Sequence, residues 1–243
     1  MKPFVCSFPL CAFLSALGLS QTLESSACIE KNTVQIELES QYRVEKEGRL
    51  REGAWVDPGA LIRLGVTDNM ELQLGVPVVQ EWGVGENETV SSLHRFGASQ
   101  LGVTLNLWNE GRVIPEGAVM ARAVIPMNGG LDFNALGTLV SLNLSRALAA
   151  GFNLGFNVGA VTSAEEGSAG FYIANLDYAP NGKIHCFLEY SNALQKACAP
   201  LNTLCAGFGL GLTDSIAVDF SIARGLDHAM FYTGGILTWV LGN

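Results

Sequence analysis

Charged side chains at the polar positions of alternating apolar stretches are the residues of this sequence that could do chemistry. Asp177 and His185 would lie opposite each other if the turn between them centres on Asn181, and such a pair could stabilise the structure, gate a proton-linked step or take part in catalysis. The other charges could form a lattice across a pore, which would stabilise it, tune its ion selectivity as charged rings do in channels, or do both. The candidate lumen-lining residues are Arg63, Glu71, Arg122, Asp177, His185, Glu189 and Asp219.

Enzyme chemistry has little support in the sequence. His94 and His228, with Asp227 beside the latter, could serve a barrel hydrolase, but no spaced Ser–His–Asp constellation accompanies them. The cysteines and histidines show no metal-ligand spacing. The formal charge of −9 argues against a nucleic-acid partner, because binding phosphates requires clustered Lys and Arg. We therefore expect no catalytic residues, no metal or cofactor, and no binding of nucleic acid.

The elements that must position these charges are strands, and residues 60–78 form the clearest pair. Apolar and polar residues alternate throughout this stretch except at 67–69, which predicts a β-hairpin with a three-residue loop. Asn69 tolerates the left-handed conformation that often closes such a loop, and Val66 would then pair with Met70. This register sets Arg63, Leu64 and Gly65 opposite Gln73, Leu72 and Glu71, respectively.

The same alternation recurs along the chain and predicts about twelve strands. No convincing helical stretch lies between them. The predicted strands are 33–44, 60–66, 70–78, 96–107, 119–125, 140–144, 152–159, 170–178, 184–191, 204–212, 216–222 and 231–241.

The links between these strands alternate in length. The short links are 67–69, 109–113, 145–150, 179–183 and 213–215, and the longer ones are 45–57, 81–92, 127–132, 162–169, 192–201 and 225–230. Short periplasmic turns alternating with longer extracellular loops are typical of outer-membrane barrels, in which an even number of strands returns both termini to the periplasm.

The two faces of the predicted strands indicate their surroundings. One face is aliphatic, whereas the other carries residues such as Asn153, Gly155 and Asn157, which have too little bulk for the exposed face of a soluble sheet. Small and polar residues are suited to line a water-filled lumen, and the aliphatic face would then contact lipid. Aromatic residues at both ends of the strands fit the interfacial girdles of such barrels. A secreted soluble β-sandwich is the alternative.

The first 27 residues resemble a secretory signal peptide, with Lys2 followed by an apolar stretch and then small residues. Cleavage could follow Gly18 or Ala27, and the second site would place Cys28 first, as in a lipoprotein. We therefore divide the chain into a signal peptide, residues 1–27, and a barrel, residues 28–243. Export to an oxidising compartment would let the mature cysteines form disulfides, although their spacing selects no connectivity. These cysteines are Cys28, Cys186, Cys198 and Cys205.

Two short motifs resemble those of a known family. The pattern R-x-G-x-T-D-N-x-E-L from Arg63 to Leu72, and Val218-Asp219-Phe220-Ser221 followed by Gly225, are similar to motifs of the MetA-pathway phenol-degradation family of bacterial outer-membrane proteins, often labelled transporters. The chain departs from that family in ending at Asn243 rather than on an aromatic residue, and in its cysteine content. The resemblance implies an outer-membrane barrel that transports small solutes, and it assigns no catalytic or binding residue.

The sequence therefore predicts an all-β, antiparallel transmembrane β-barrel of about twelve strands in the bacterial outer membrane. We expect it to provide transport or diffusion of small molecules, hydrophobic or aromatic compounds among them. The alternatives are a structural or surface-interaction barrel with a closed lumen and, less favoured, a barrel enzyme. The expected partners are the lipid bilayer, the outer-membrane assembly machinery and a small solute that the sequence does not identify.

Overall fold

The computed structural model describes residues 23–47, 50–76, 78–84, 90–127, 130–163, 167–195 and 200–242. Within these ranges fourteen strand segments form a single sheet, and the helical segments are the short 3-10 turns η1 (Phe133–Ala135) and η2 (Ala149–Gly151). No helix in the same ranges is long and apolar enough to cross a membrane. The strands are β1 (Val34–Glu47), β2 (Leu50–Thr67), β3 (Met70–Val76), β4 (Val78–Val84), β5 (Val90–Phe96), β6 (Ser99–Trp108), β7 (Glu116–Ile125), β8 (Gly137–Ala147), β9 (Phe152–Ser163), β10 (Gly167–Tyr178), β11 (Ile184–Gln195), β12 (Leu201–Gly211), β13 (Ile216–Gly225) and β14 (Ala229–Leu241).

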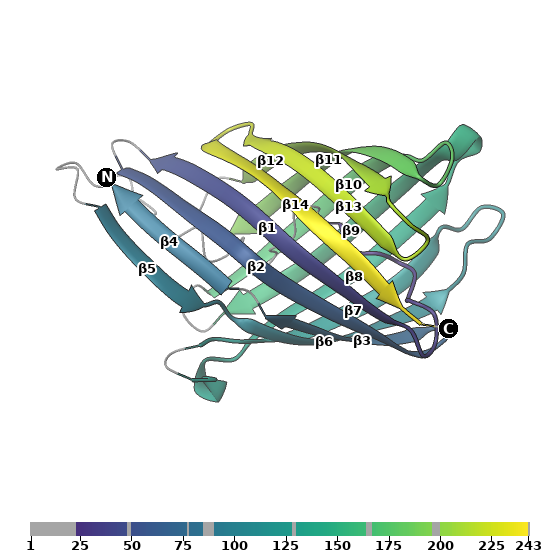
Figure 1. Cartoon of the computed structure of the whole chain (residues 1–243), viewed down its shortest axis with the longest axis horizontal. Helices are drawn as coiled ribbons and strands as arrows, with labels where there is room; N and C mark the ends of the chain where they lie inside the picture. The colour runs from purple at the N-terminus through teal and green to yellow at the C-terminus, as the bar shows by residue number, and fades with distance from the viewer. Residues whose placement is uncertain are drawn as a thin grey trace.

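The sheet closes on itself into a barrel, because β1 pairs with both β14 and β2 (Figure 1). The long strand β2 pairs with β3 along one half and with β4 along the other. In the same way, β6 pairs with β3 and β5 pairs with β4. Thus β3 with β4, and β5 with β6, each fill one position in the wall, and the barrel has 12 antiparallel strands. This arrangement confirms the predicted fold class.

The two ends of the barrel carry alternate links. We call the end with residues 68–69 and 212–215 the turn end, and the end with residues 126–136 and 226–228 the loop end. The first and last strands meet at the turn end, where Val34 of β1 pairs with Leu241 of β14.

The strands reach further toward the loop end than the alternation indicates. The prediction that 45–57 and 81–92 are loops is wrong, because most of both stretches lies in β1, β2, β4 and β5. Charged residues follow one another here, as in Glu45-Lys46-Glu47. A strand that passes beyond the apolar layer of a membrane keeps its backbone pairing but no longer needs an apolar face. The period-2 signal therefore ends before the strand does.

The hairpin of β2 and β3 has the predicted register and a different turn. Arg63 pairs with Gln73, Leu64 with Leu72 and Gly65 with Glu71, as expected, but a bulge after Gly65 makes Thr67 the partner of Met70. Asn69 does not adopt a positive φ. Instead, the Asn69 backbone N–H donates to Thr67 Oγ1 (3.4 Å), which in turn donates to Asn69 Oδ1 (2.8 Å).

The aliphatic face of the wall points outward. Leu72, Leu154 and Leu101 are 45%, 47% and 53% exposed, whereas the inward Glu71 and Asn157 are 0% and 1% exposed. A soluble sandwich would bury the aliphatic face, so the structure excludes that alternative. Aromatic rings pair across strands near both ends, Phe152 with Tyr178 at 4.5 Å between centroids and Tyr172 with Tyr190 at 6.0 Å.

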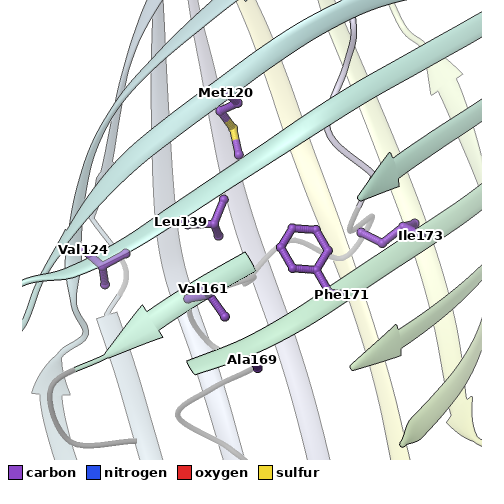
Figure 2. Close-up of a cluster of buried hydrophobic side chains, with 7 residues drawn as sticks. All are labelled: Met120, Val124, Leu139, Val161, Ala169, Phe171 and Ile173. Carbon is purple, nitrogen blue, oxygen red and sulfur yellow. The ribbon is translucent and has the colours of Figure 1, made fainter. Parts of the chain in front are cut away.

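An apolar cluster lines part of the lumen on β7 to β10 (Figure 2). A Cβ atom at Gly159 would lie 2.5 Å from Phe171 Cζ, so the ring of Phe171 lies directly over this glycine. The barrel interior thus combines an apolar zone toward the loop end with the polar groups described next. The members of the cluster are Met120, Val124, Leu139, Val161, Ala169, Phe171 and Ile173.

Candidate functional site

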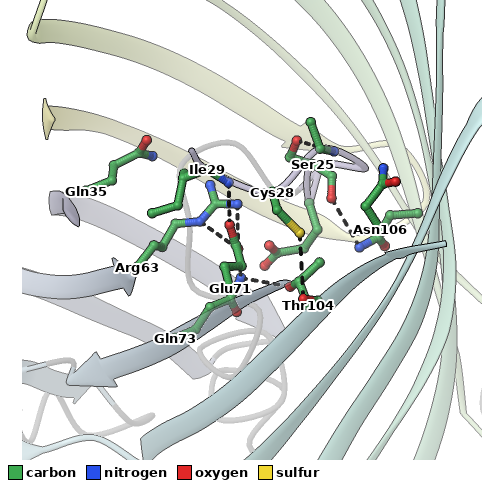
Figure 3. A network of polar contacts seen from close by, with 12 residues as sticks. Ser25, Cys28, Ile29, Gln35, Arg63, Glu71, Gln73, Thr104 and Asn106 are labelled. Carbon is green, nitrogen blue, oxygen red and sulfur yellow. Dashed lines mark hydrogen bonds and ion pairs between the residues drawn. The ribbon is translucent and has the colours of Figure 1, made fainter. Parts of the chain in front are cut away.

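Residues 23–32, which we call the N-terminal segment, lie inside the barrel before the chain enters β1. Figure 3 shows three of them, Ser25, Cys28 and Ile29, facing side chains of the barrel wall. Of the expected signal peptide, residues 1–22 lie outside the described residues, whereas residues 23–26 form hydrogen bonds with side chains of the barrel wall.

The main chain of this segment is held by wall side chains. Asn157 on β9 makes two hydrogen bonds with Glu24, accepting from its backbone N–H (2.7 Å) and donating to its backbone carbonyl (3.0 Å). The Leu23 N–H donates to Glu189 Oε2 on β11 (3.2 Å). Further along, Asn106 Nδ2 donates to the Ser26 carbonyl (2.9 Å).

The segment continues toward β2 and β3. The Ile29 N–H donates to Glu71 Oε2 (2.9 Å), and the Cys28 thiol donates to the Thr104 carbonyl (3.6 Å). The Gly65 N–H donates to the Thr33 carbonyl (3.0 Å), where the chain joins the wall. These contacts tie the segment to the wall from β11 round to β2.

Arg63 and Glu71 form the centre of a buried charged network. Arg63 Nε and Nη2 both donate to Glu71 Oε1, at 2.9 and 2.7 Å, and Arg63 Nη1 lies 3.5 Å from Glu37 Oε1. Gln73 Nε2 donates to Glu71 Oε1 (2.7 Å) and to Thr104 Oγ1 (3.1 Å). Paired and hydrogen-bonded charges of this kind can be held away from water.

Arg122 connects this network to the N-terminal segment. Its Nε donates to Gln73 Oε1 (2.7 Å), and its Nη2 forms an ion pair with Glu24 Oε1 (2.7 Å). A Cβ atom at Gly102 on β6 would lie 2.6 Å from Arg122 Cγ. The lack of a side chain at this one position therefore lets Arg122 lie along the wall.

His185 and Asp219 form a second charged group, on β11 and β13. His185 Nε2 lies 2.9 Å from Asp219 Oδ1, and the pair crosses β12 at Gly209, where a Cβ atom would lie 2.2 Å from both side chains. The predicted pairing of Asp177 with His185 is wrong. Asp177 pairs with Phe187 instead, because the turn centres on Gly182, which adopts a positive φ of 68°, rather than on Asn181.

A third polar group lies at the loop end. The Asp227 carboxylate lies 2.8 Å from His228 Nδ1 and accepts from the Asn202 backbone N–H at 3.0 Å. Slight burial raises the pKa of Asp227, but the hydrogen bonds from His228 and Asn202 outweigh it and lower this pKa to about 2. The side chain of His94, which the sequence also places near the long loops, lies outside the described residues.

The four cysteines that could form disulfides in the mature chain lie in different surroundings. Cys28 and Cys186 are free thiols, the first against the lumenal wall and the second exposed, and Cys198 lies outside the described residues. Cys205 Sγ lies 3.1 Å from Tyr232 Oη.

Sequence reasoning missed the residues that hold the N-terminal segment. Glu24 falls within the predicted signal peptide, and Asn106, Asn143 and Asn157, which bond the main chain of the segment, have no predicted role as binding residues. A usable signal was present, since Glu24 places a charge directly before the small residues that suggested a second cleavage site.

Comparison with known proteins supports the fold. No family model matches the sequence, and no curated protein matches it either. The COG4313 outer membrane channel from Pseudomonas putida F1 superposes with a TM-score of 0.65 at 8% identity, covering 89% of this chain and 98% of that one. The transport unit of the autotransporter AIDA-I from Escherichia coli gives 0.56 at 9% identity, with 96% and 97% covered. The KdgM porin in complex with disordered oligogalacturonate gives 0.52 at 7%, with 85% and 98% covered. The chain is therefore a β-barrel of the outer-membrane type.

Proposed function

We propose that this chain is an outer-membrane channel for small molecules, related to the MetA-pathway phenol-degradation family. The observation that carries the proposal is the reversal of faces, with aliphatic residues outward and hydrogen-bonded charges inward. A wall of this kind is expected in a bilayer, since a lumen is the one place where its charges meet water. In this proposal a signal peptide directs export, the outer-membrane assembly machinery inserts the barrel, and the turn end faces the periplasm.

The lumen favours neutral, cationic or apolar solutes over anions. More carboxylates than guanidinium groups face inward, and a passing anion would meet their field within the screening length of about 8 Å. The apolar cluster on β7 to β10 offers a surface for hydrophobic or aromatic compounds. The inward carboxylates include Glu37, Glu39, Glu45, Glu71, Glu116, Asp177, Glu189 and Asp219, and the guanidinium groups include Arg43, Arg63 and Arg122.

Conductance and liposome swelling test this proposal directly. Purified protein in planar bilayers should give discrete channel events, and proteoliposomes should swell in sugars, amino acids or simple aromatic compounds, with slower swelling for anionic members of the panel. A folded sample that neither conducts nor admits any of these solutes would contradict the proposal.

A closed barrel with a structural or interaction role is the second candidate. It is favoured by the N-terminal segment, which lies across part of the lumen. A folded wild-type protein that shows neither conductance nor liposome swelling would support this candidate. A barrel enzyme would instead show hydrolysis that is lost on replacing His228 or His94.

A further inference from the structure

We propose that the inner wall from β3 to β11 is a binding site for a polypeptide main chain, and that the chain's own residues 23–29 occupy it. The contacts carry this inference. Wall side chains meet the segment at the backbone groups of successive residues, namely Leu23 N, Glu24 N and O, Ser25 O, Ser26 O and Ile29 N. A wall that contacts the backbone in this way recognises a chain conformation more than a particular sequence.

Asn157 is the most specific of these contacts. Its amide accepts from the N–H and donates to the carbonyl of the same residue, Glu24, as a neighbouring strand would do for a paired residue. Asn157 is 1% exposed, and Asn143, its partner on β8, and Glu71 on β3 are fully buried. Because buried polar groups need partners, these side chains are arranged to receive a peptide backbone.

Glycines shape the wall around the path of the segment. A Cβ atom at Gly155 would lie 2.5 Å from Leu23 Cδ2, and one at Gly65 would lie 2.0 Å from the Glu30 carbonyl oxygen. Gly65 needs a residue without a side chain, since the backbone of Glu30 approaches the strand too closely for any other, whereas a side chain at Gly155 would require the Leu23 side chain to shift. The wall is thus matched most closely to the end of the segment that joins β1.

The site also selects between the two cleavage positions in the sequence. Cleavage after Ala27 would remove Leu23, Glu24 and Ser26, whereas cleavage after Gly18 keeps them. Cys28 lies with its thiol against the Thr104 carbonyl inside the barrel, where a lipid anchor could not reach the bilayer. We infer that the mature chain starts before Leu23 and is not lipidated at Cys28.

A disulfide trap tests the site without reference to transport. Ser26 Oγ and Ser145 Oγ lie 2.6 Å apart, so Ser26→Cys with Ser145→Cys should form a disulfide in the full-length, membrane-assembled protein. The native cysteines Cys28, Cys186, Cys198 and Cys205 are changed to Ser in this background. Peptide mass spectrometry of this variant identifies the bond, and the intact mass of the unchanged protein, which keeps Cys28, gives the first residue of the mature chain.

A matched pair within the wall serves as control. Thr138 Oγ1 and Thr162 Oγ1 lie 2.8 Å apart on β8 and β9, so Thr138→Cys with Thr162→Cys should also form a disulfide. If the 138–162 disulfide forms and the 26–145 disulfide does not, the proposal is overturned. A mature chain that starts at Cys28 would also overturn it. Absence of both bonds from a folded barrel would refute the wall geometry on which the site rests. Either result is independent of whether the barrel conducts.

Trapping rates test recognition of the backbone. Asn157→Ala removes two main-chain hydrogen bonds and should slow formation of the 26–145 disulfide about tenfold. Asn175→Ala truncates an equally buried amide whose nitrogen has no hydrogen-bond partner among the described residues, and it should change the rate less than about twofold. Ile29→Ser keeps the backbone N–H and should behave like Asn175→Ala. A strong effect of Ile29→Ser together with none of Asn157→Ala would show that side chains are recognised instead.

Discussion

Two groups of charges face the lumen, and they differ in what covers them. The Arg63–Glu71 network on β2 and β3 lies under the N-terminal segment, and Glu71 is 0% exposed. The His185–Asp219 pair on β11 and β13 is more open, with 31% of the His185 side chain exposed. Alternation along the strands predicts the inward direction of both groups equally well. The role of an inward charge therefore depends on whether the N-terminal segment covers it.

The covered group should matter more for stability. A charge held away from water relies on its partner, so removal of one member leaves the other unpaired in a low-dielectric site. An exposed pair regains hydration when it is broken, and such pairs contribute little. Conversely, the open pair is the one that a passing solute can approach.

The largest expected effect is that of Glu71→Ala. It leaves Arg63 with Glu37, at 3.5 Å, as its nearest ion-pair partner among the described residues and removes the acceptor of the Ile29 N–H, which should cost about 3–5 kcal/mol. Urea unfolding of the barrel in lipid vesicles measures this loss. His185→Ala is the matched variant of the open pair and should cost under about 1 kcal/mol. Similar losses for both variants would remove the distinction between the two groups.

The outward face gives a reference for burial by lipid. Val158, in the middle of β9, and Leu148, in a link at the turn end, are 42% and 43% exposed in the barrel alone. Val158→Arg should cost about 2–4 kcal/mol because it faces the bilayer interior, and Leu148→Arg about 0–1 kcal/mol because it lies near the interface. The same unfolding assay compares them. Equal costs would argue against a bilayer around the wall.

Much of the wall could be predicted from the sequence because the bilayer and the lumen impose opposite requirements on successive residues. Alternation gave the strands, their inward faces and the register of Arg63 with Gln73. It fails where Glu45-Lys46-Glu47 place charges at successive positions of β1, so that the apolar face is lost before the strand ends. The Asp177–His185 pairing failed because a shift of the turn centre by one residue moves the pairing by two.

The candidate site was less predictable, for a physical reason. The hydrogen bonds of Asn157 go to the backbone of Glu24, which every residue type carries, so no side-chain pattern in the sequence marks them. The residues from Leu23 to Ala27 also fit the small, polar composition of a signal cleavage region. Only the folded wall distinguishes the two interpretations.

Arg122→Glu should have an intermediate effect and links stability to selectivity. It replaces the ion pair with Glu24 by two like charges and removes the hydrogen bond to Gln73, at a cost of about 1.5–3 kcal/mol. It should also release the N-terminal segment, which lowers the yield of the 26–145 disulfide, and shift the reversal potential toward cations. Arg122→Gln is the control, since it removes the positive charge without adding a negative one and should shift the potential less. An unchanged potential in a conducting variant would place Arg122 off the permeation path.

The smallest effect is expected for Asp219→Asn in the open pair. The Asn side chain can still accept a hydrogen bond from His185 Nε2 through its carbonyl oxygen, and Gly209 leaves the same space for both side chains, so unfolding should change by under about 1 kcal/mol. The variant nevertheless removes a negative charge from a part of the lumen that the N-terminal segment does not contact among the described residues. Since screening acts over about 8 Å at physiological salt, that charge should bias only ions that pass close to it. The reversal potential should therefore move toward anions, and by less than Arg122→Glu moves it toward cations. A destabilisation as large as that of Glu71→Ala would mean that the open pair is buried in the membrane-assembled barrel, and the contrast between the two groups would no longer hold.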